Sequence, residues 1–284
     1  MTYRRRDSPL HATRAAVGLA WCLALAIGAL VQSNPVMLGG EAVAVGATGL
    51  AAGVWTELRR ALPLAAALAL TVAAVNALVT RNGLTVIWRL GDLPFVGQTD
   101  VTLEATVYGL VLGLRAAILV LSAVLLSVAV DPDELLALMR RWSFRSALTA
   151  SVATRMVPVL LRDSRRLADA QRCRPGRPPG RVQLLRATTA GVFDRALDVA
   201  AVLEVRGYAS ARRPRRGMSR PWSRHDLAFS ASAVAVIALA VVARGTFSAY
   251  PALEIRAGAG LYACAGGLAA AALAPFLDRR GVAP

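Results

Sequence analysis

The sequence predicts an all-α polytopic membrane protein with about six transmembrane helices. Of its 284 residues, 56% are hydrophobic, and these form long runs rather than alternating stripes. Because a helix needs about 20 residues to cross the hydrocarbon core, runs near that length are candidate spans. The formal net charge of +16 comes from arginines gathered between the apolar runs, as in loops on one side of a membrane.

Six apolar segments have about the length of a span. They are residues 14–33, 36–54, 61–80, 103–130, 226–244 and 257–276. Asn34-Pro35 predicts a tight turn between the first two, since proline keeps the preceding residue out of the helical region. Residues 81–102 contain glycines and a proline, and we expect them to form an external loop. The start of the chain resembles a signal peptide but lacks a clear cleavage site, so we expect it to remain as the first helix.

The placement of arginines predicts the orientation and the domain organisation. Arginines precede the first span, follow the second and the sixth, and are densest between residues 131 and 226. All of these fall on one side of the membrane if both termini are cytoplasmic, as an even number of spans requires. We therefore expect an N-terminal transmembrane bundle (1–130), a cytoplasmic region of long amphipathic helices (131–225) and a C-terminal transmembrane hairpin (226–284).

The cytoplasmic region begins with a strong helix start. Asp131 can cap the helix, and a proline stands at the first helical position. Glu134 lies three residues after Asp131, where a capping box places an acid. Two longer amphipathic helices follow, over about 146–174 and 181–206. On the first we expect Asp163 to lie opposite the apolar stripe, and on the second we expect the same of Arg195.

Both long helices end in an arginine beside a residue that stops the helix. The two motifs are Cys173-Arg174-Pro175 and Val205-Arg206-Gly207. One interpretation is an ordinary helix end, where arginine complements the helix dipole and glycine ends the helix. Repetition of the same arrangement on two long helices favours a second interpretation, in which the arginines dock into partner proteins.

One charged residue lies inside a predicted span. Arg115 stands in the fourth apolar segment, where a charge is expensive and is a functional candidate by default. It is a candidate intramembrane contact, either to polar groups inside the bundle or to another membrane subunit. In the same segment, Gly109 and Gly113 are four residues apart, a spacing that allows close approach of two helices.

Several classes of function lack their sequence signatures. The chain has no phosphate-binding loop, no G-x-S-x-G or H-E-x-x-H motif, and no paired carboxylates or histidine cluster in or near the spans, so we expect no catalytic residues and no enzyme activity. Three scattered cysteines argue against disulfides and against a metal site. The basic residues lack interleaved aromatics, which disfavours nucleic-acid binding. A self-sufficient membrane permease with a basic cytoplasmic regulatory segment remains an alternative.

Four stretches resemble the T component of energy-coupling-factor (ECF) transporters, the EcfT/CbiQ family. They are QSNPVML (32–38), DPDELLALMRR (131–141), ATRMVPVLLRDSRRLADAQRCRPG (153–176) and RALDVAAVLEVRGYASARRPRR (195–216). The Arg206 motif matches the family pattern of Glu-x-Arg-Gly-aromatic. The Arg174 motif departs from its pattern, since cysteine and proline replace the usual small residue and glycine, and Arg172 competes for the role.

The resemblance implies a non-catalytic scaffold in a bacterial plasma membrane. In that family, two coupling helices dock their arginine motifs into grooves on two ABC-type ATPase subunits. The membrane helices hold a small substrate-binding S component that takes up a vitamin or a transition metal. The chain itself is then expected to bind no cofactor, because ATP and Mg²⁺ belong to the partner ATPases, and no nucleic acid.

Overall fold

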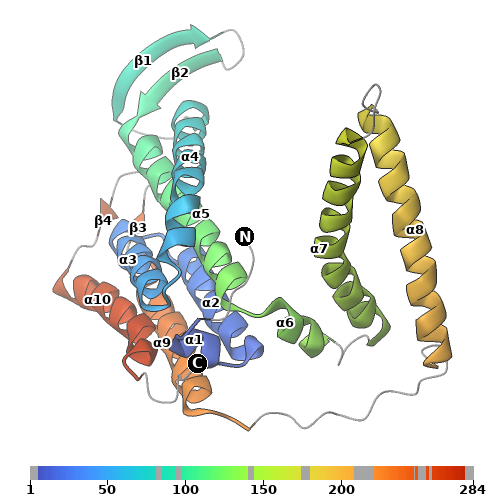
Figure 1. Ribbon diagram of the computed structural model, residues 1–284. Helices are drawn as coiled ribbons and strands as arrows, with labels where there is room; N and C mark the ends of the chain where they lie inside the picture. Colours follow the sequence, from blue (N-terminus) through green and yellow to red (C-terminus); the bar gives the residue numbers. More distant parts are fainter. Residues whose placement is uncertain are drawn as a thin grey trace. The chain divides into compact units, whose positions relative to one another are not determined.

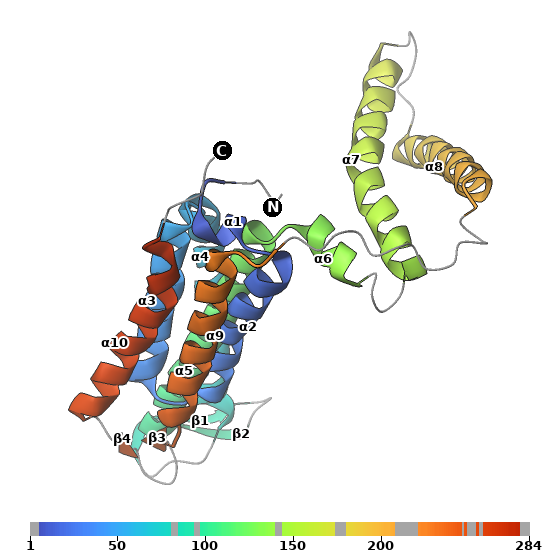
Figure 2. The same cartoon turned by 90° about the horizontal axis from the view of Figure 1, so that it is seen from below.

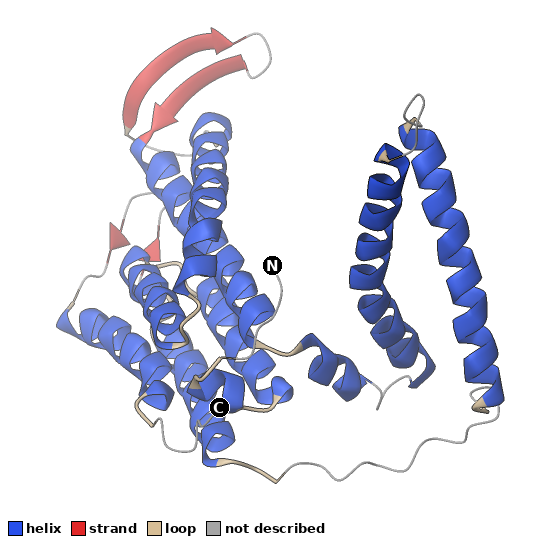
Figure 3. Cartoon of the chain, in the orientation of Figure 1, coloured by secondary structure: helices blue, strands red, loops and turns tan. Residues whose placement is uncertain are grey.

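The computed structural model describes residues 6–80, 85–93, 97–139, 144–173, 180–207, 221–245, 247–248, 254–255 and 258–278. These residues are predominantly helical (Figures 1 and 3). By contact, the chain divides into two compact units. The first, called the membrane unit, comprises Met1–Leu135 and Pro221–Pro284, and the second, the α7–α8 unit, comprises Leu136–Arg220.

The membrane unit contains all six predicted apolar segments as helices. They are α2 (Ala15–Val31), α3 (Pro35–Ala51), α4 (Trp55–Val79), α5 (Leu103–Ala129), α9 (Arg224–Val242) and α10 (Ala259–Leu273). Among the described residues, four helices are long and apolar enough to cross a membrane: α4, α5, α9, and α10 together with the 3₁₀ turn η1 (Ala274–Phe276). Helices α2 and α3 are apolar but shorter, at 17 residues each.

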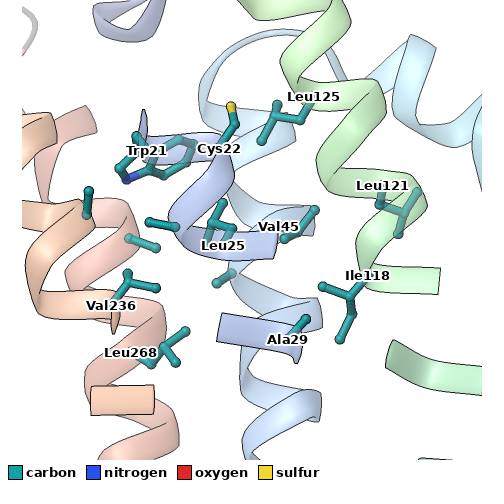
Figure 4. Close-up of a cluster of buried hydrophobic side chains, with 14 of the residues drawn as sticks. Trp21, Cys22, Leu25, Ala29, Val45, Ile118, Leu121, Leu125, Val236 and Leu268 are labelled. Atoms are coloured by element: carbon teal, nitrogen blue, oxygen red, sulfur yellow. The ribbon is translucent and has the colours of Figure 1, made fainter. Parts of the chain in front are cut away.

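Helix α2 lies at the centre of the bundle, with α3, α5 and α9 packed around it (Figure 1). Its buried face includes Trp21 and Leu25, which meet Val45 of α3, Ile118 of α5 and Val236 of α9 in one apolar cluster (Figure 4). In water, burial of apolar side chains is the main favourable contribution to helix packing. In lipid, close packing of side chains between the helices stabilises the bundle instead. Contacts with α3, α5 and α9 together therefore set the position of α2.

An aromatic cluster joins α2 to the C-terminal pair of helices. The rings of Trp21, Phe229 and Phe276 meet edge to face, with centroids 5.2–6.0 Å apart. The indole N–H of Trp21 donates to Ser232 Oγ at 2.9 Å, and that hydroxyl donates to the backbone oxygen of Ala271 at 2.7 Å. The buried indole is thus fully satisfied, as aromatic residues with a polar atom require.

Helices α4 and α5 approach closely through small residues, as the spacing of Gly109 and Gly113 predicts. A Cβ atom at Gly113 would lie 2.4 Å from the backbone oxygen of Ala69, and one at Gly109 would lie 2.8 Å from that of Ala73. The two glycines face backbone rather than movable side chains, so a larger residue cannot be accommodated by a rotamer change. Small residues in this pattern let helix backbones pack in a membrane.

The prediction of an external loop over 81–102 is wrong about the backbone conformation, because the chain forms an antiparallel pair of strands within these residues. Strands β1 (Val86–Leu93) and β2 (Gly97–Thr102) pair from Val86 opposite Thr102 to Leu93 opposite Gly97. β-Branched residues at the open end of the pair, Val86, Ile87, Val101 and Thr102, favour extended backbone. A second short pair, β3 (Phe247–Ser248) and β4 (Glu254–Ile255), lies between α9 and α10.

Both strand pairs lie at one end of the bundle, and the short helix α1 (Pro9–Ala12) lies at the other (Figure 2). The α1 end also holds the start of α4, because Arg6 forms an ion pair with Glu57. The arginine-flanked helix ends that the sequence places on one side therefore meet at one end of the bundle.

The connection to the α7–α8 unit begins with α6 (Pro132–Met139). Asp131 caps this helix, since its Oδ1 accepts from the amide of Asp133 at 2.9 Å. The reciprocal half of the predicted capping box is not found among the described residues. Glu134 Oε2 accepts instead from the amide of Ala15, 119 residues away, at 3.1 Å.

We predict that Gly113→Ala destabilises the membrane unit by about 1–3 kcal/mol, because the new methyl group collides with the backbone of α4. Gly46→Ala is the matched control, since a Cβ atom at Gly46 in α3 meets nothing within 4 Å. Thermal unfolding of the purified variants in one detergent compares them. Equal midpoints for Gly113→Ala and Gly46→Ala would contradict the close approach of α4 and α5.

Candidate functional site: the ends of α7 and α8

The end of α8 (Arg181–Val205) presents the Val205-Arg206-Gly207 motif to solvent. The Val205 side chain is 89% exposed, and Arg206 is also exposed. Arg206 is the C-cap residue, and its amide donates to the backbone oxygen of Val202 at 3.1 Å. Gly207 follows with φ +73°, a left-handed conformation that favours glycine and stops the helix.

The guanidinium of Arg206 has no hydrogen bond or ion pair with any residue that the structure describes. Arg172, at the end of α7 (Phe144–Arg172), differs because it pairs with Asp169 one turn earlier at 3.5 Å. A free guanidinium presents five donors in a planar fork, suited to carboxylates or backbone oxygens of another molecule. The end of α8 therefore presents an exposed charge that is available to another molecule.

At the end of α7, the structure describes only the first residue of the Cys173-Arg174-Pro175 motif. Cys173 is exposed, has a free thiol and continues the helix, since its amide donates to the backbone oxygen of Asp169 at 3.2 Å. Arg174 and Pro175 lie outside the described residues. Their assigned role therefore stays a prediction from the sequence.

Helices α7 and α8 form a hairpin in which a charged pair lies between the helices. Arg195 Nη1 donates to Asp163 Oδ2, and about 40% of each side chain remains exposed. The expectation that both residues point away from the apolar faces is wrong. The apolar faces are only partly used for packing, since Phe193 and Leu185 are each 66% exposed.

The last residues of α7 and of α8 stand at opposite ends of this hairpin, since α7 ends where α8 begins (Figure 1). With 25 residues, α8 is about 38 Å long at 1.5 Å per residue. The ends of α7 and α8 are therefore too far apart to enter one groove. They are two separate exposed points on one hairpin.

Arg115 finds its partner inside the membrane unit. Its Nη2 donates to the backbone oxygen of Gln32, the residue that ends α2. A helix leaves its last carbonyl groups unpaired, and a cation there also complements the helix dipole. This bond agrees with the first expectation for Arg115, a polar partner inside the bundle, and the second, a contact to another membrane subunit, stays a prediction.

Glu41 lies in α3, is completely buried and is not among the residues predicted from the sequence to be functional. Neither carboxyl oxygen has a hydrogen-bond partner among the described residues, and Oε1 would lie 2.5 Å from a Cβ atom at Gly28. The absence of a side chain at Gly28 gives the carboxyl group its space. An acid inside a predicted span is the signal that could have found it. No group of three or more His, Cys, Asp or Glu side chains within the described ranges could hold a metal ion.

Comparison with protein families identifies the chain. A family model described as CbiQ, cobalt transport protein, matches residues 6–216. The chain belongs to the CbiQ family. The match runs from the start of the membrane unit through both arginine motifs and ends before α9, and it confirms the resemblance noted from the sequence. A search of curated proteins finds no match. As a CbiQ-family protein with several apolar helices, the chain is a membrane component of a transporter.

We predict that Gly207→Ala loosens the end of α8, because a left-handed conformation costs a residue with a side chain about 1–2 kcal/mol. Hydrogen–deuterium exchange at residues 202–207 should become faster. Gly191→Ala, in the interior of α8 with open space around its Cβ position, is the control and should leave this exchange unchanged. Identical exchange in both variants would exclude Gly207 as the residue that fixes Arg206.

The ion pair predicts how the α7–α8 hairpin responds to acid. The hydrogen bond from Arg195 lowers the pKa of Asp163 below its ordinary value of 3.8. A depressed pKa in the folded state means that the pair contributes stability above about pH 4 and loses it as the pH falls through the lower, folded value. The hairpin should therefore keep its geometry from pH 7 to 5 and open below pH 4.

Spin labels at Val157→Cys and Leu197→Cys, in a chain without its native cysteines, measure this opening as a longer distance between α7 and α8. Asp163→Asn should open the hairpin at every pH and remove the acid dependence. Asp169→Asn is the control, because Asp169 pairs only within α7. If neither a lower pH nor Asp163→Asn changes this distance, the ion pair between Asp163 and Arg195 does not hold the helices together.

Proposed function

We propose that this chain is the membrane-embedded scaffold and coupling subunit of an ATP-driven ECF importer. In this proposal it transmits the motions of two ABC-type ATPase subunits to a small substrate-binding S component. The chain hydrolyses no ATP itself, and ATP and Mg²⁺ are bound by the partner ATPases. The observation that carries the proposal is the exposed, unpaired Arg206 at the fixed end of a long helix, in a CbiQ-family chain.

The chemistry of the α8 end suits docking into a protein groove. Because the backbone of Arg206 is already ordered at the helix end, docking orders only its side chain, whose planar fork is pre-organised for paired hydrogen bonds. Val205 beside it is almost fully exposed and would bury its apolar surface in the same contact. Arg206 would supply charged hydrogen bonds and Val205 apolar contact.

The length of the hairpin supports two partners rather than one. Contact points separated by the length of α8 fit two ATPase subunits, with Arg206 in one groove and Arg174 in the other. In this proposal Arg172 is the less suitable candidate at the end of α7, because it already pairs with Asp169.

The substrate is proposed to be a transition metal or a vitamin, recognised by the S component. The printed description of the family, cobalt transport protein, makes Co²⁺ the first substrate to test. The arginine distribution supports a bacterial plasma-membrane protein with six spans and both termini in the cytoplasm. In that orientation the α7–α8 unit lies on the side where ATP is available.

Purification of the tagged chain from its own host, followed by mass spectrometry, tests the proposal. We expect two ABC-type ATPase subunits, identical or different, and one small hydrophobic protein to accompany it. Recovery of the chain alone, under conditions where other membrane complexes survive, would favour a self-sufficient permease instead.

Arg206→Ala sharpens this experiment. Truncating one partner of a buried charged contact costs about 2–5 kcal/mol, so ATPase binding at this end should weaken roughly 30-fold or more. Arg186→Ala is the control, since Arg186 is an exposed arginine on the same helix without a described partner. Equal recovery of the ATPases and equal substrate uptake with Arg206→Ala and Arg186→Ala would refute the assignment.

A further inference from the structure

The chain crosses between its two units at only two places. It leaves the membrane unit after Leu135 and returns at Pro221. Every movement of the α7–α8 unit that reaches the membrane helices through covalent bonds must pass through these two crossings. What the residues at the crossings contact within the membrane unit therefore decides which helix receives that movement.

Residues beside both crossings contact the same part of the membrane unit, the first residues of α2. Glu134, just before the first crossing, accepts from the amide of Ala15 at 3.1 Å. At the second crossing, the ring of Trp222 lies 5.2 Å from the guanidinium carbon of Arg14. Asp226 Oδ1, four residues further on, accepts from the amide of Arg14 at 2.9 Å, over 212 residues of sequence.

The start of α2 depends on these remote residues. Arg14 occupies the N-cap position, and its side chain makes no capping hydrogen bond. The first amides of a helix have no partner within the helix, and carboxylates are preferred there because they also meet the positive end of the dipole. Two carboxylates therefore bind amides at one helix start, each carried by a different crossing.

Asp226 also joins this contact rigidly to α9. Its Oδ2 accepts from the amide of Ser223 at 2.9 Å, and its own amide donates to Ser223 Oγ at 3.2 Å, which completes a capping box. The Arg14 Nε atom lies 3.6 Å from the same Oδ2 atom, and Asp226 is almost completely buried. The starts of α2 and α9 are thus held as one piece.

We infer that four positioning residues, called the α2 junction, carry the movement of the α7–α8 unit to the central membrane helix. They are Arg14, Glu134, Trp222 and Asp226. This inference rests on the proposed coupling function. Because α2 packs against α3, α5 and α9, a displacement of its start moves the centre of the bundle rather than its edge. As positioning residues, these four transmit movement and take no part in ATP hydrolysis, so their loss should separate ATP hydrolysis from uptake.

The test uses the whole transporter, reconstituted in vesicles with its ATPases, with uptake of Co²⁺ and ATP hydrolysis measured together. The variant is the double change Glu134→Ala with Trp222→Ala, which removes one fastening at each crossing. Both residues are exposed, so the packed core is left intact. We expect the ATPases to remain bound and active while uptake per ATP falls about tenfold or more.

Conservative and neighbouring variants separate transmission from folding. Glu134→Gln with Trp222→Phe keeps an acceptor oxygen and an aromatic ring, and it should restore uptake per ATP. Arg224→Ala removes a surface ion pair with Asp278 at the same helix start but no contact to α2, and it should have no effect. If the double alanine variant does not accumulate, Trp222→Ala alone decides, because Trp222 is 61% exposed.

Two results would overturn the inference in different ways. Normal uptake per ATP in the double alanine variant, with uptake abolished by Arg206→Ala, would reject the α2 junction and leave the coupling function standing. Normal uptake with Arg206→Ala as well would reject the coupling function and the junction with it.

Discussion

Helix α2 begins and ends without a capping side chain of its own, and the arrangement of the membrane unit follows from how its ends are satisfied. Unpaired backbone groups at a buried helix end are expensive, so other elements must supply partners. Carboxylates of Glu134 and Asp226 bind amides at the start, and Arg115 binds the carbonyl of Gln32 at the end. Each charge has the sign that the helix dipole prefers.

These three contacts bring together segments that are far apart in the sequence. They bind the fourth apolar helix, the exit to the α7–α8 unit and the return from it to one central element. The aromatic contacts of Trp21 with Phe229 and Phe276 add α9 and the end of the chain to the same helix. Specific polar contacts thus fix which apolar helices are neighbours, a choice that apolar surface alone does not make in lipid.

The sequence predicts the helices well, because long apolar runs and 3.6-residue periodicity are local signals. It also predicts the close approach at Gly109 and Gly113 and the helix stop at Gly207. It does not predict the strand pair over 86–102, where short β-branched segments lie beside turn residues. It does not predict the partner of Glu134 either, because the same sequence pattern is compatible with a capping box and with a contact to Ala15. Arg14 and Asp226 become meaningful only once folding brings them together.

The stiffness and length of α8 set the scale of movement at its end. For a straight helix of about 38 Å, a tilt of about 10° around its Gly180 end carries the other end through about 7 Å. That displacement exceeds the length of any hydrogen bond that Arg206 can make. A small angular change at the Gly180 end would therefore be enough to separate the guanidinium from any group hydrogen-bonded to it, with no bending of the helix.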